Sequence, residues 1–282
     1  MNRLHTLILV SLLLLLSACE GDYMNEPRDL LVVEGWIENG SGPVVMLTKT
    51  LPISTEPHAM DDIQDYVVRF GAVVSVTDGK DTVVLTGHYA KDYYPPYVYS
   101  SSEMLGVVGK TYTLMVEYHG QSVRAKTVIP RPVPLDRITC REMEDGRYGI
   151  VAEFRDDPAS KDWYKTFVKV SGRDKVFHSA YLGLIDDDML ASHDVSLNIY
   201  PADVNGGKGL GYDLYYNKGD EVDVMFCTTT EDIYRYWRGF EEVSSLSRNP
   251  LFPISYNLAS NIQGGIGYWA GYGSRYYHLV VE

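Results

Sequence analysis

Short runs of apolar and polar residues alternate along most of this chain, at the spacing of β-strands. Residues 30–37 and 44–50 are β-branched runs, and the segment 39–43 (Asn-Gly-Ser-Gly-Pro) between them has the composition of a turn. Successive side chains of a strand point to opposite faces, so each run has the pattern of a strand with one buried face. From residue 30 onward, the chain is predicted to be a β-structure.

Two further pairs of runs have the turn chemistry of β-hairpins. One pair joins residues 72–77 to 82–86 through Asp78-Gly79, and the other joins 111–118 to 121–129 through His119-Gly120. Glycine supplies the positive φ that tight hairpin turns require. In the second hairpin, one face carries Tyr112, Leu114, Val116 and Tyr118, and the other carries Thr113, Met115 and Glu117. This alternation predicts a half-buried antiparallel strand.

Strands of this kind predict a mainly β fold. Over residues 30–130 we expect an antiparallel β-sandwich of immunoglobulin or transthyretin type. The segment 129–134 (Ile-Pro-Arg-Pro-Val-Pro) then interrupts the pattern, because proline donates no amide hydrogen to a sheet. It predicts the boundary to a second β-rich domain over residues 131–282, with strands near 150–155, 164–171, 195–200 and 222–228.

One amphipathic helix is expected in the second domain, near residues 229–246. Thr228 and Glu231 form a capping-box pattern, and Asn249-Pro250 closes the segment. The apolar positions recur at helical spacing and comprise Ile233, Trp237, Phe240 and Val243 or Leu246.

The last residues of the chain interleave glycines with large rings. The glycines are Gly264, Gly265, Gly267, Gly271 and Gly273, and the rings are Tyr268, Trp269, Tyr272, Tyr276 and Tyr277. Two interpretations stand: bulged strands with aromatic rings lying over the glycines, or a loop left open for a ligand.

The first residues have the organisation of an export signal. The apolar stretch Leu7–Leu16 is shorter than the roughly 20 residues that span a membrane, Arg3 precedes it, and Ser17-Ala18 follows it. Leu16-Ser17-Ala18-Cys19 resembles the lipobox of bacterial lipoproteins, in which the cysteine sulfur is acylated. We therefore expect residues 1–18 to be a lipoprotein signal peptide and Cys19 to carry lipid that anchors the protein to a membrane. An ordinary secretory signal with a chance cysteine is the alternative.

Residues 19–29 are expected to form an acidic tether behind the lipid. Glu20, Asp22 and Glu26 resemble the sorting signal that directs lipoproteins of Bacteroidota to the outer face of the outer membrane. A solvated acidic linker would have the same composition. Surface exposure is the expectation, and a periplasmic location is the alternative.

Charge and cysteine content exclude several classes. The formal net charge is −13, so the chain repels phosphate backbones and nucleic-acid binding is not expected. Besides Cys19 the chain has only Cys140 and Cys227, too few for a disulfide scaffold. These two cysteines either pair with each other or serve as small buried apolar residues.

No metal site or catalytic site is predicted. The run Asp186-Asp187-Asp188 could bind calcium, but consecutive side chains in an extended chain point apart, so a solvated loop is favoured. The segment 203–207 (Asp-Val-Asn-Gly-Gly) begins like a calcium loop, yet Leu214 stands where the closing glutamate is required. The histidines are scattered, and no nucleophile elbow or nucleotide-binding glycine motif is present. We expect a protein that is not an enzyme and has no cofactor.

The segment 93–99 (Tyr-Tyr-Pro-Pro-Tyr-Val-Tyr) is the strongest candidate for an interaction surface. It is expected as a loop between hairpins that displays Tyr93, Tyr94, Tyr97 and Tyr99 on a backbone stiffened by proline. Tyrosine rings provide contact area with little rotamer entropy to lose. The alternative is packing within a β-sheet, where tyrosine is common.

Several segments together resemble one known family. They are VVEGWI, VVMLTKTLP, GKTYTLMVEYHG, AKTVIPRPVPLD and SNIQGGIGYW, which lie along nearly the whole mature chain. The family is a group of Bacteroidota outer-membrane lipoproteins called domain of unknown function 4249. The resemblance implies an accessory to a TonB-dependent outer-membrane transporter in nutrient uptake, and it carries no catalytic residues. The expected function is ligand or transporter binding by a lipid-anchored protein, with a structural or adhesive surface subunit as the alternative and a hydrolase as a third hypothesis.

Overall fold

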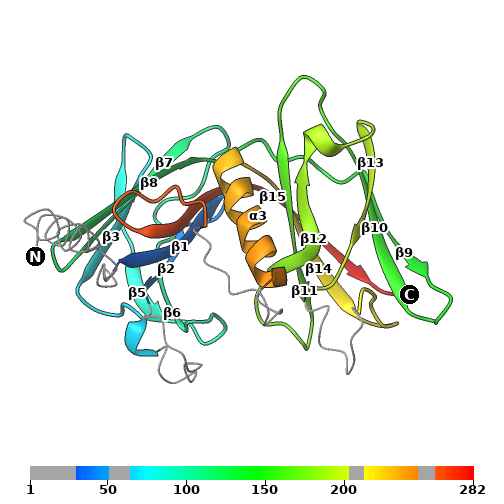
Figure 1. Cartoon of the computed structure of the whole chain (residues 1–282), viewed down its shortest axis with the longest axis horizontal. Coiled ribbons are helices and arrows are strands. Elements are labelled where there is room, and N and C mark those ends of the chain that lie inside the picture. Colours follow the sequence, from blue (N-terminus) through cyan, green and yellow to red (C-terminus); the bar gives the residue numbers. More distant parts are fainter. Residues whose placement is uncertain (1–29, 51–63, 203–212, 247–257) are drawn as a thin grey trace, which may run out of the picture.

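A computed structural model describes residues 30–50, 64–202, 213–246 and 258–282 of the protein. These residues form three β-sheets of eight, four and three strands together with one α-helix (Figure 1). The prediction of a mainly β fold with sandwich-like packing is confirmed. Within these described ranges, no helix has the length and apolar character needed to cross a membrane.

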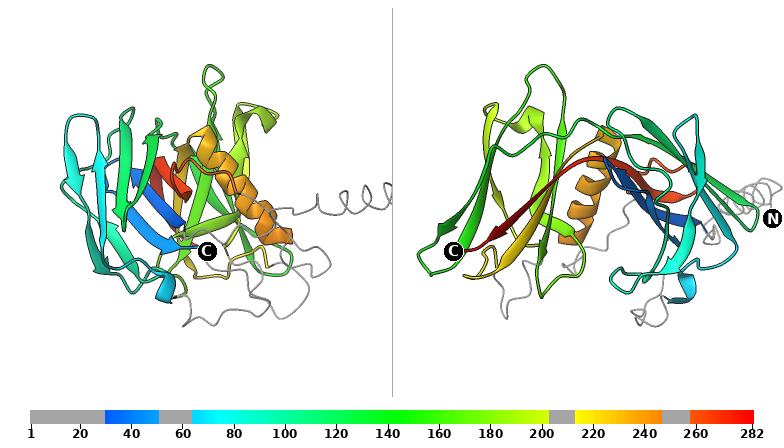
Figure 2. Two further views of the ribbon diagram at one scale, coloured as in Figure 1. Left: turned by 60° about the vertical axis from the view of Figure 1, so that its left-hand side comes forward. Right: turned by 180° about the vertical axis from the view of Figure 1, so that it is seen from behind.

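The eight-stranded sheet runs through the whole molecule. Its strands, in spatial order, are β12 (His178–Asp186), β11 (Trp163–Val170), β14 (Glu221–Thr229), β15 (Ile266–Val280), β1 (Leu31–Glu38), β2 (Val44–Lys49), β6 (Tyr97–Ser100) and β5 (Thr86–Tyr89). The first half of β15 pairs in parallel with β1, and its second half pairs antiparallel with β14. Figure 2 shows β15, in red, passing from one half of the molecule to the other.

Two smaller sheets complete the β-structure. One contains β4 (Thr82–Val84), β3 (Ala72–Thr77), β7 (Thr111–Tyr118) and β8 (Gln121–Val128), and the other contains β13 (Asp194–Ile199), β10 (Tyr148–Arg155) and β9 (Arg137–Glu142). Both predicted hairpins are present, and their turns use the expected left-handed backbone at Gly79 (φ 92°) and Gly120 (φ 82°). Turn chemistry therefore identified both hairpins correctly.

Each small sheet packs on the eight-stranded sheet and encloses a hydrophobic core. The four-stranded sheet covers one core that contains Trp269 and Tyr112, which are both almost fully buried. The three-stranded sheet covers a second core in which the rings of Phe154, Tyr164 and Phe226 lie 5.0–5.4 Å apart. Trp269 belongs to the first core and Tyr277 and Leu279 to the second. Successive side chains of a strand point to opposite faces, and these three positions are all odd. Both small sheets therefore cover the same side of β15.

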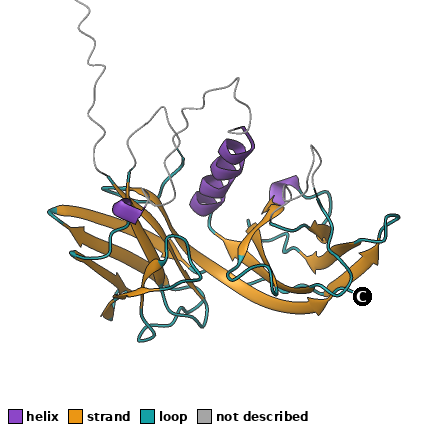
Figure 3. Ribbon diagram, turned by 90° about the horizontal axis from the view of Figure 1, so that it is seen from below, coloured by secondary structure: helices purple, strands orange, loops and turns teal. Residues whose placement is uncertain are grey.

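The opposite side of the long sheet is covered by α3 (Glu231–Leu246), which Figures 1 and 3 show between the two β lobes. A third cluster forms there, where Ile233 and Trp237 of the helix meet Tyr268 and Tyr272 of β15. Burying side chains of this size contributes about 1.5–3 kcal/mol each. Tertiary packing therefore holds the helix on the sheet.

The helix begins later than the sequence pattern predicts. Thr228 is not its cap, because this residue is in β14 and its hydroxyl accepts a hydrogen bond from the Val133 amide at 3.3 Å. The first turn instead starts at Thr230, whose carbonyl accepts from the Tyr234 amide at 2.9 Å. The expected stripe is correct at Ile233 and Trp237, but Phe240 is 41% exposed.

Backbone crossings explain the glycines of β15. A Cβ atom at Gly267 would lie 1.9 Å from the Val33 carbonyl oxygen, and one at Gly271 would lie 2.1 Å from the Val128 oxygen. Gly267 also has φ 109°, a conformation that other residues rarely adopt. Of the two interpretations of this segment, the strand is confirmed and the open loop is wrong.

The predicted domain boundary at residue 130 lies between β8 and β9, in the proline-rich segment. The final strand, β15, returns across that boundary to pair with β1, so the two halves of the chain share one sheet. The strands predicted near 150–155, 164–171, 195–200 and 222–228 correspond to β10, β11, β13 and β14, whereas β9 and β12 were not predicted.

Candidate functional site

The predicted tyrosine loop is the tip of a hairpin. The sequence pattern predicts a loop between two hairpins. Strands β5 and β6 pair with each other, however, so the loop joins the two strands of a single hairpin. Tyr97 and Tyr99 belong to β6 and face the first core. Tyr99 is only 4% exposed, donates a hydrogen bond to the Val68 carbonyl at 3.0 Å, and has its pKa raised to about 12 by burial. The surface role expected of Tyr99 is therefore wrong, and Tyr97 packs against its edge at 5.6 Å.

The other two tyrosines of the loop remain accessible. Tyr94 is 52% exposed. Tyr93 is half-buried, and its ring centroid lies 6.1 Å from that of Trp36 in β1. The hairpin tip therefore extends over the side of the long sheet that carries α3.

On that side, β1 presents an alternating row of Glu34, Trp36 and Glu38. The Tyr268 hydroxyl donates to Glu34 Oε1 at 2.9 Å, and the Tyr276 hydroxyl donates to Glu38. Burial raises the pKa of Glu34, and the bond from Tyr268 partly opposes that shift. The carboxylates of β1 thus orient two tyrosine rings of β15.

A second ring contact lies next to Tyr276, on the side toward β12. Phe177 lies edge-on to Tyr276 with centroids 5.7 Å apart, and Lys169 Nζ lies 5.6 Å from the Phe177 centroid. Lys169 also pairs with Asp223 at 3.1 Å. Burial raises the pKa of Tyr276, and the neighbouring Glu38 carboxylate raises it further. We name Trp36, Tyr93, Phe177 and Tyr276 the aromatic patch.

The patch has the physical character of a binding surface. Trp36, Tyr93 and Phe177 are half-buried and Tyr276 is 53% exposed, so each ring is held in place yet presents a face to solvent. Rings that are ordered before binding lose little entropy when a ligand stacks on them. The adjoining Glu38 carboxylate is only 8% exposed and accepts from Tyr276, and the Lys169 ammonium pairs with Asp223. This arrangement can bind a ligand or partner.

Deeper under α3 lies a buried ion pair. The Lys165 side chain is fully buried, with Nζ 2.7 Å from Glu241 Oε1 and 4.8 Å from the Trp237 ring centroid. Burial lowers the pKa of Lys165, and Glu241 opposes that shift. Since the Lys165 side chain is fully buried and pairs with Glu241 of α3, it fastens the helix and is not accessible to a ligand.

The acidic run 186–188 does bring its side chains together, contrary to the expectation from extended chain. The short 3-10 helix η2 (Asp187–Met189) gathers the three carboxylates within 4.8 Å of one another, and Lys161 Nζ forms ion pairs with all of them. The ammonium group occupies the position that a cation would take. The other predicted loop, 203–207, lies outside the described residues.

The two cysteines are unpaired thiols in the structure. Cys227 is fully buried beside the Ser274 hydroxyl at 3.5 Å, and burial raises its pKa. A thiol of this kind is a poor nucleophile.

Cys19, Glu20, Asp22 and Glu26 lie outside the described residues, so the expected lipidation and sorting signal stay predictions. Of the predicted surface residues, the structure places Tyr93 in the aromatic patch and leaves Tyr94 exposed. Trp36, Phe177 and Tyr276 were not predicted. The even positions of Trp36 in β1 and Tyr276 in β15 were the available signal, but only strand pairing shows that these two positions share a face.

Comparison with known protein families gives a match over most of the chain. A family model described as "Domain of unknown function (DUF4249)" matches residues 20–277. No curated protein matches the chain.

Proposed function

The chain belongs to the DUF4249 family, and from that premise we propose that it is a lipid-anchored outer-membrane protein that binds a ligand or partner beside a TonB-dependent transporter. In this proposal the protein faces the cell exterior, catalyses no reaction and needs no cofactor.

The anchor is supported by the sequence Leu16-Ser17-Ala18-Cys19 after an apolar stretch too short to span a bilayer. Two or more acyl chains hold a protein stably on a membrane, since each buried methylene contributes about 0.8 kcal/mol. Glu20, Asp22 and Glu26 would then form the acidic sorting signal.

The aromatic patch is the observation that carries the binding role. Its rings come from the hairpin tip, β1, β15 and the segment before β12, and they stay partly exposed on a surface that α3 covers only in part. A tethered protein holds a captured ligand near its neighbour and so raises the effective concentration without new chemistry. This suits an accessory to a transporter.

Co-purification after mild detergent extraction tests the proposal. The double variant Trp36→Ala/Tyr276→Ala removes two rings of the patch, and Phe70→Ala removes an 83% exposed ring outside it. Loss of one interface aromatic costs about 2 kcal/mol, or near thirtyfold in affinity. We expect an outer-membrane transporter to co-purify with the wild type and Phe70→Ala but not with the double variant. Equal recovery with all three, at matched thermal stability, would contradict the proposal.

A structural or adhesive surface subunit is the second candidate. Strands β5 and β12 lie at the two ends of the eight-stranded sheet, within the described part of the chain, and open edges can add a strand from another molecule. Ladders of self-association after crosslinking, without a transporter, would favour this function.

A further inference from the structure

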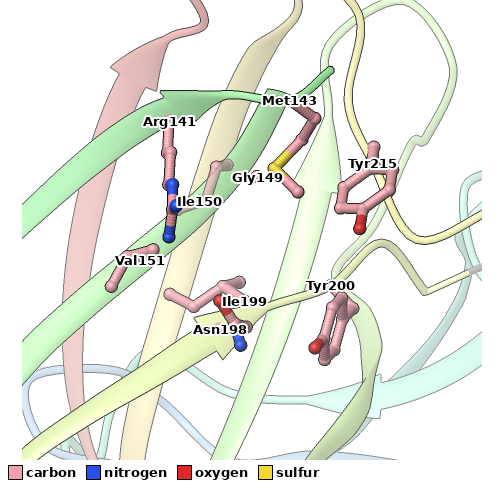
Figure 4. Close-up of a pocket in the computed structure, with 9 residues that line it drawn as sticks. All are labelled: Arg141, Met143, Gly149, Ile150, Val151, Asn198, Ile199, Tyr200 and Tyr215. Carbon is pink, nitrogen blue, oxygen red and sulfur yellow. The ribbon is translucent and has the colours of Figure 1, made fainter. Parts of the chain in front are cut away.

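A pocket of about 210 Å³ lies on the outer face of the three-stranded sheet, away from the aromatic patch (Figure 4). Its floor is Gly149 in β10, which has no side chain and pairs with Arg141 of β9. Val151 and Asn198 pair on the neighbouring strands. Tyr200 and Tyr215 stand along one side, as the figure shows. A missing side chain in the middle of a strand thus creates the hollow.

The polar groups around this hollow have spare hydrogen-bonding capacity. Nearby arginines are engaged, because Arg147 pairs with Asp145 and Asp213, and Arg137 pairs with Glu153. Among the residues that the structure describes, neither the Arg141 guanidinium nor the Asn198 amide has a side-chain partner. Within those same residues, Arg141 is also the one charged group that lines the pocket.

We propose that this pocket binds a hexuronate unit, a sugar ring that carries one carboxylate. The planar guanidinium of Arg141 matches a carboxylate in a bidentate pair. The Asn198 amide and the hydroxyl of Tyr200 or Tyr215 can donate to and accept from sugar hydroxyls, while a tyrosine ring packs on the sugar face.

The pocket's size and charge favour this class over others. Pockets for drug-sized ligands measure about 300–1,000 Å³, so the hollow accepts a single small unit. One arginine balances one carboxylate, whereas a phosphate carries more negative charge than the site offers. An amino acid would need an anionic partner for its ammonium group, and no carboxylate lines the pocket among the described residues. An aliphatic acid could pair with the guanidinium but would offer no hydroxyls to the amide and tyrosine hydroxyl groups.

Isothermal titration of the mature chain with galacturonate and glucuronate tests the proposal. We expect binding of at least one hexuronate with a dissociation constant below about 10 mM, and weaker or no binding of galactose, glucose and inorganic phosphate. Titration with an oligogalacturonate distinguishes two sources of the ligand. If the natural ligand is the end of a polymer, the oligomer should bind more tightly than galacturonate; if it is a free monosaccharide, the oligomer should not.

Three variants assign the site. Gly149→Val places a side chain in the hollow, where the Cβ atom meets Met143 Sδ at 3.7 Å and Tyr215 Cδ1 at 4.0 Å, and valine suits a strand. We expect it to abolish binding and Arg141→Gln to weaken binding at least about tenfold. Arg137→Gln makes the same change four residues earlier, on the same face of β9, and should leave binding intact. The proposal is overturned if no hexuronate binds, if galactose or phosphate binds equally well, or if Arg141→Gln binds like Arg137→Gln.

Discussion

The buried pair of Lys165 and Glu241 gives a prediction about how α3 is held on the sheet. Lys165 is fully buried, whereas the Glu241 side chain is 34% exposed. The desolvation cost of such a pair therefore falls mainly on the lysine. Replacing a buried ion pair with apolar groups is often neutral or stabilising by about 1–4 kcal/mol, while removing one partner costs about 3–5 kcal/mol.

The variants Lys165→Met and Glu241→Gln separate these effects. Methionine keeps the length of the lysine stem against Trp237 and Phe167, and Glu241 can return to water. We expect the free energy of unfolding of Lys165→Met at pH 7 to equal or exceed that of the wild type. Glu241→Gln leaves a buried ammonium without its counter-charge. We expect it to lose about 2 kcal/mol, below the usual range because Glu241 is partly solvated.

The pKa of Lys165 adds a pH dependence of known sign. Burial lowers this pKa in the folded state from the ordinary value of 10.5. At pH values between the pKa of Lys165 in the folded state and 10.5, the unfolded state binds more protons than the folded state. The free energy of unfolding therefore rises with pH across that window. The stability of the wild type relative to Lys165→Met should therefore increase from pH 7 toward pH 10.

Urea unfolding followed by tryptophan fluorescence at both pH values provides the measurement. The reasoning is refuted if Lys165→Met loses about 3 kcal/mol or more at pH 7, because the ion pair would then be a net stabiliser. It is equally refuted if Glu241→Gln is unchanged, because the buried ammonium would then not need its counter-charge.

Three further predictions concern the fold, the anchor and the acidic run. Gly267→Ala should lower the free energy of unfolding in urea by about 4 kcal/mol or more, since its Cβ would lie 1.9 Å from the Val33 oxygen. The control Gly40→Ala, with φ 81° but open space around it, should lower it by only about 1–2 kcal/mol. Equal losses would contradict the close crossing of the two strands. Cys19→Ala should abolish palmitate labelling and move the protein from the membrane pellet to the soluble fraction, and an unchanged distribution would refute the anchor. In Lys161→Gln the three carboxylates of the acidic run lose their ammonium partner. About 1 mM calcium should therefore raise the melting temperature of this variant and leave that of the wild type unchanged. A rise in the melting temperature of the wild type would contradict this prediction.

Local chemistry made much of the β-structure predictable. Asp78-Gly79 and His119-Gly120 identified two hairpins because a tight turn depends on only a few neighbouring residues. The helix cap was misplaced by two residues, because Thr228 and Thr230 both satisfy a capping preference and only the length of β14 decides between them.

Long-range pairing could not be predicted in the same way. β1 and β15 lie more than 230 residues apart, and nothing local specifies their register. The glycines of β15 carried part of that information, since Gly267 and Gly271 permit backbone crossings. The aromatic patch depends on this pairing, so Trp36 and Tyr276 could not be recognised as neighbours of Tyr93.

Two expectations failed because the local backbone was misjudged. The prolines before Tyr97 predict a loop that includes Tyr99, but the structure shows that Tyr97–Ser100 is a strand in which Val98 and Tyr99 are buried. The run 186–188 was treated as extended, yet a 3-10 turn gathers its side chains around Lys161, which lies 25 residues earlier than Asp186.

Photocrosslinking in intact cells tests the central claim, that a lipid-tethered chain presents the aromatic patch to a partner. A photoreactive phenylalanine analogue is placed at position 36 in the patch or at position 70 outside it. The account predicts a crosslink from position 36 to an outer-membrane transporter, no such crosslink from position 70, and loss of the first when Cys19→Ala is added. No crosslink from position 36, or the same products from both positions, would contradict it.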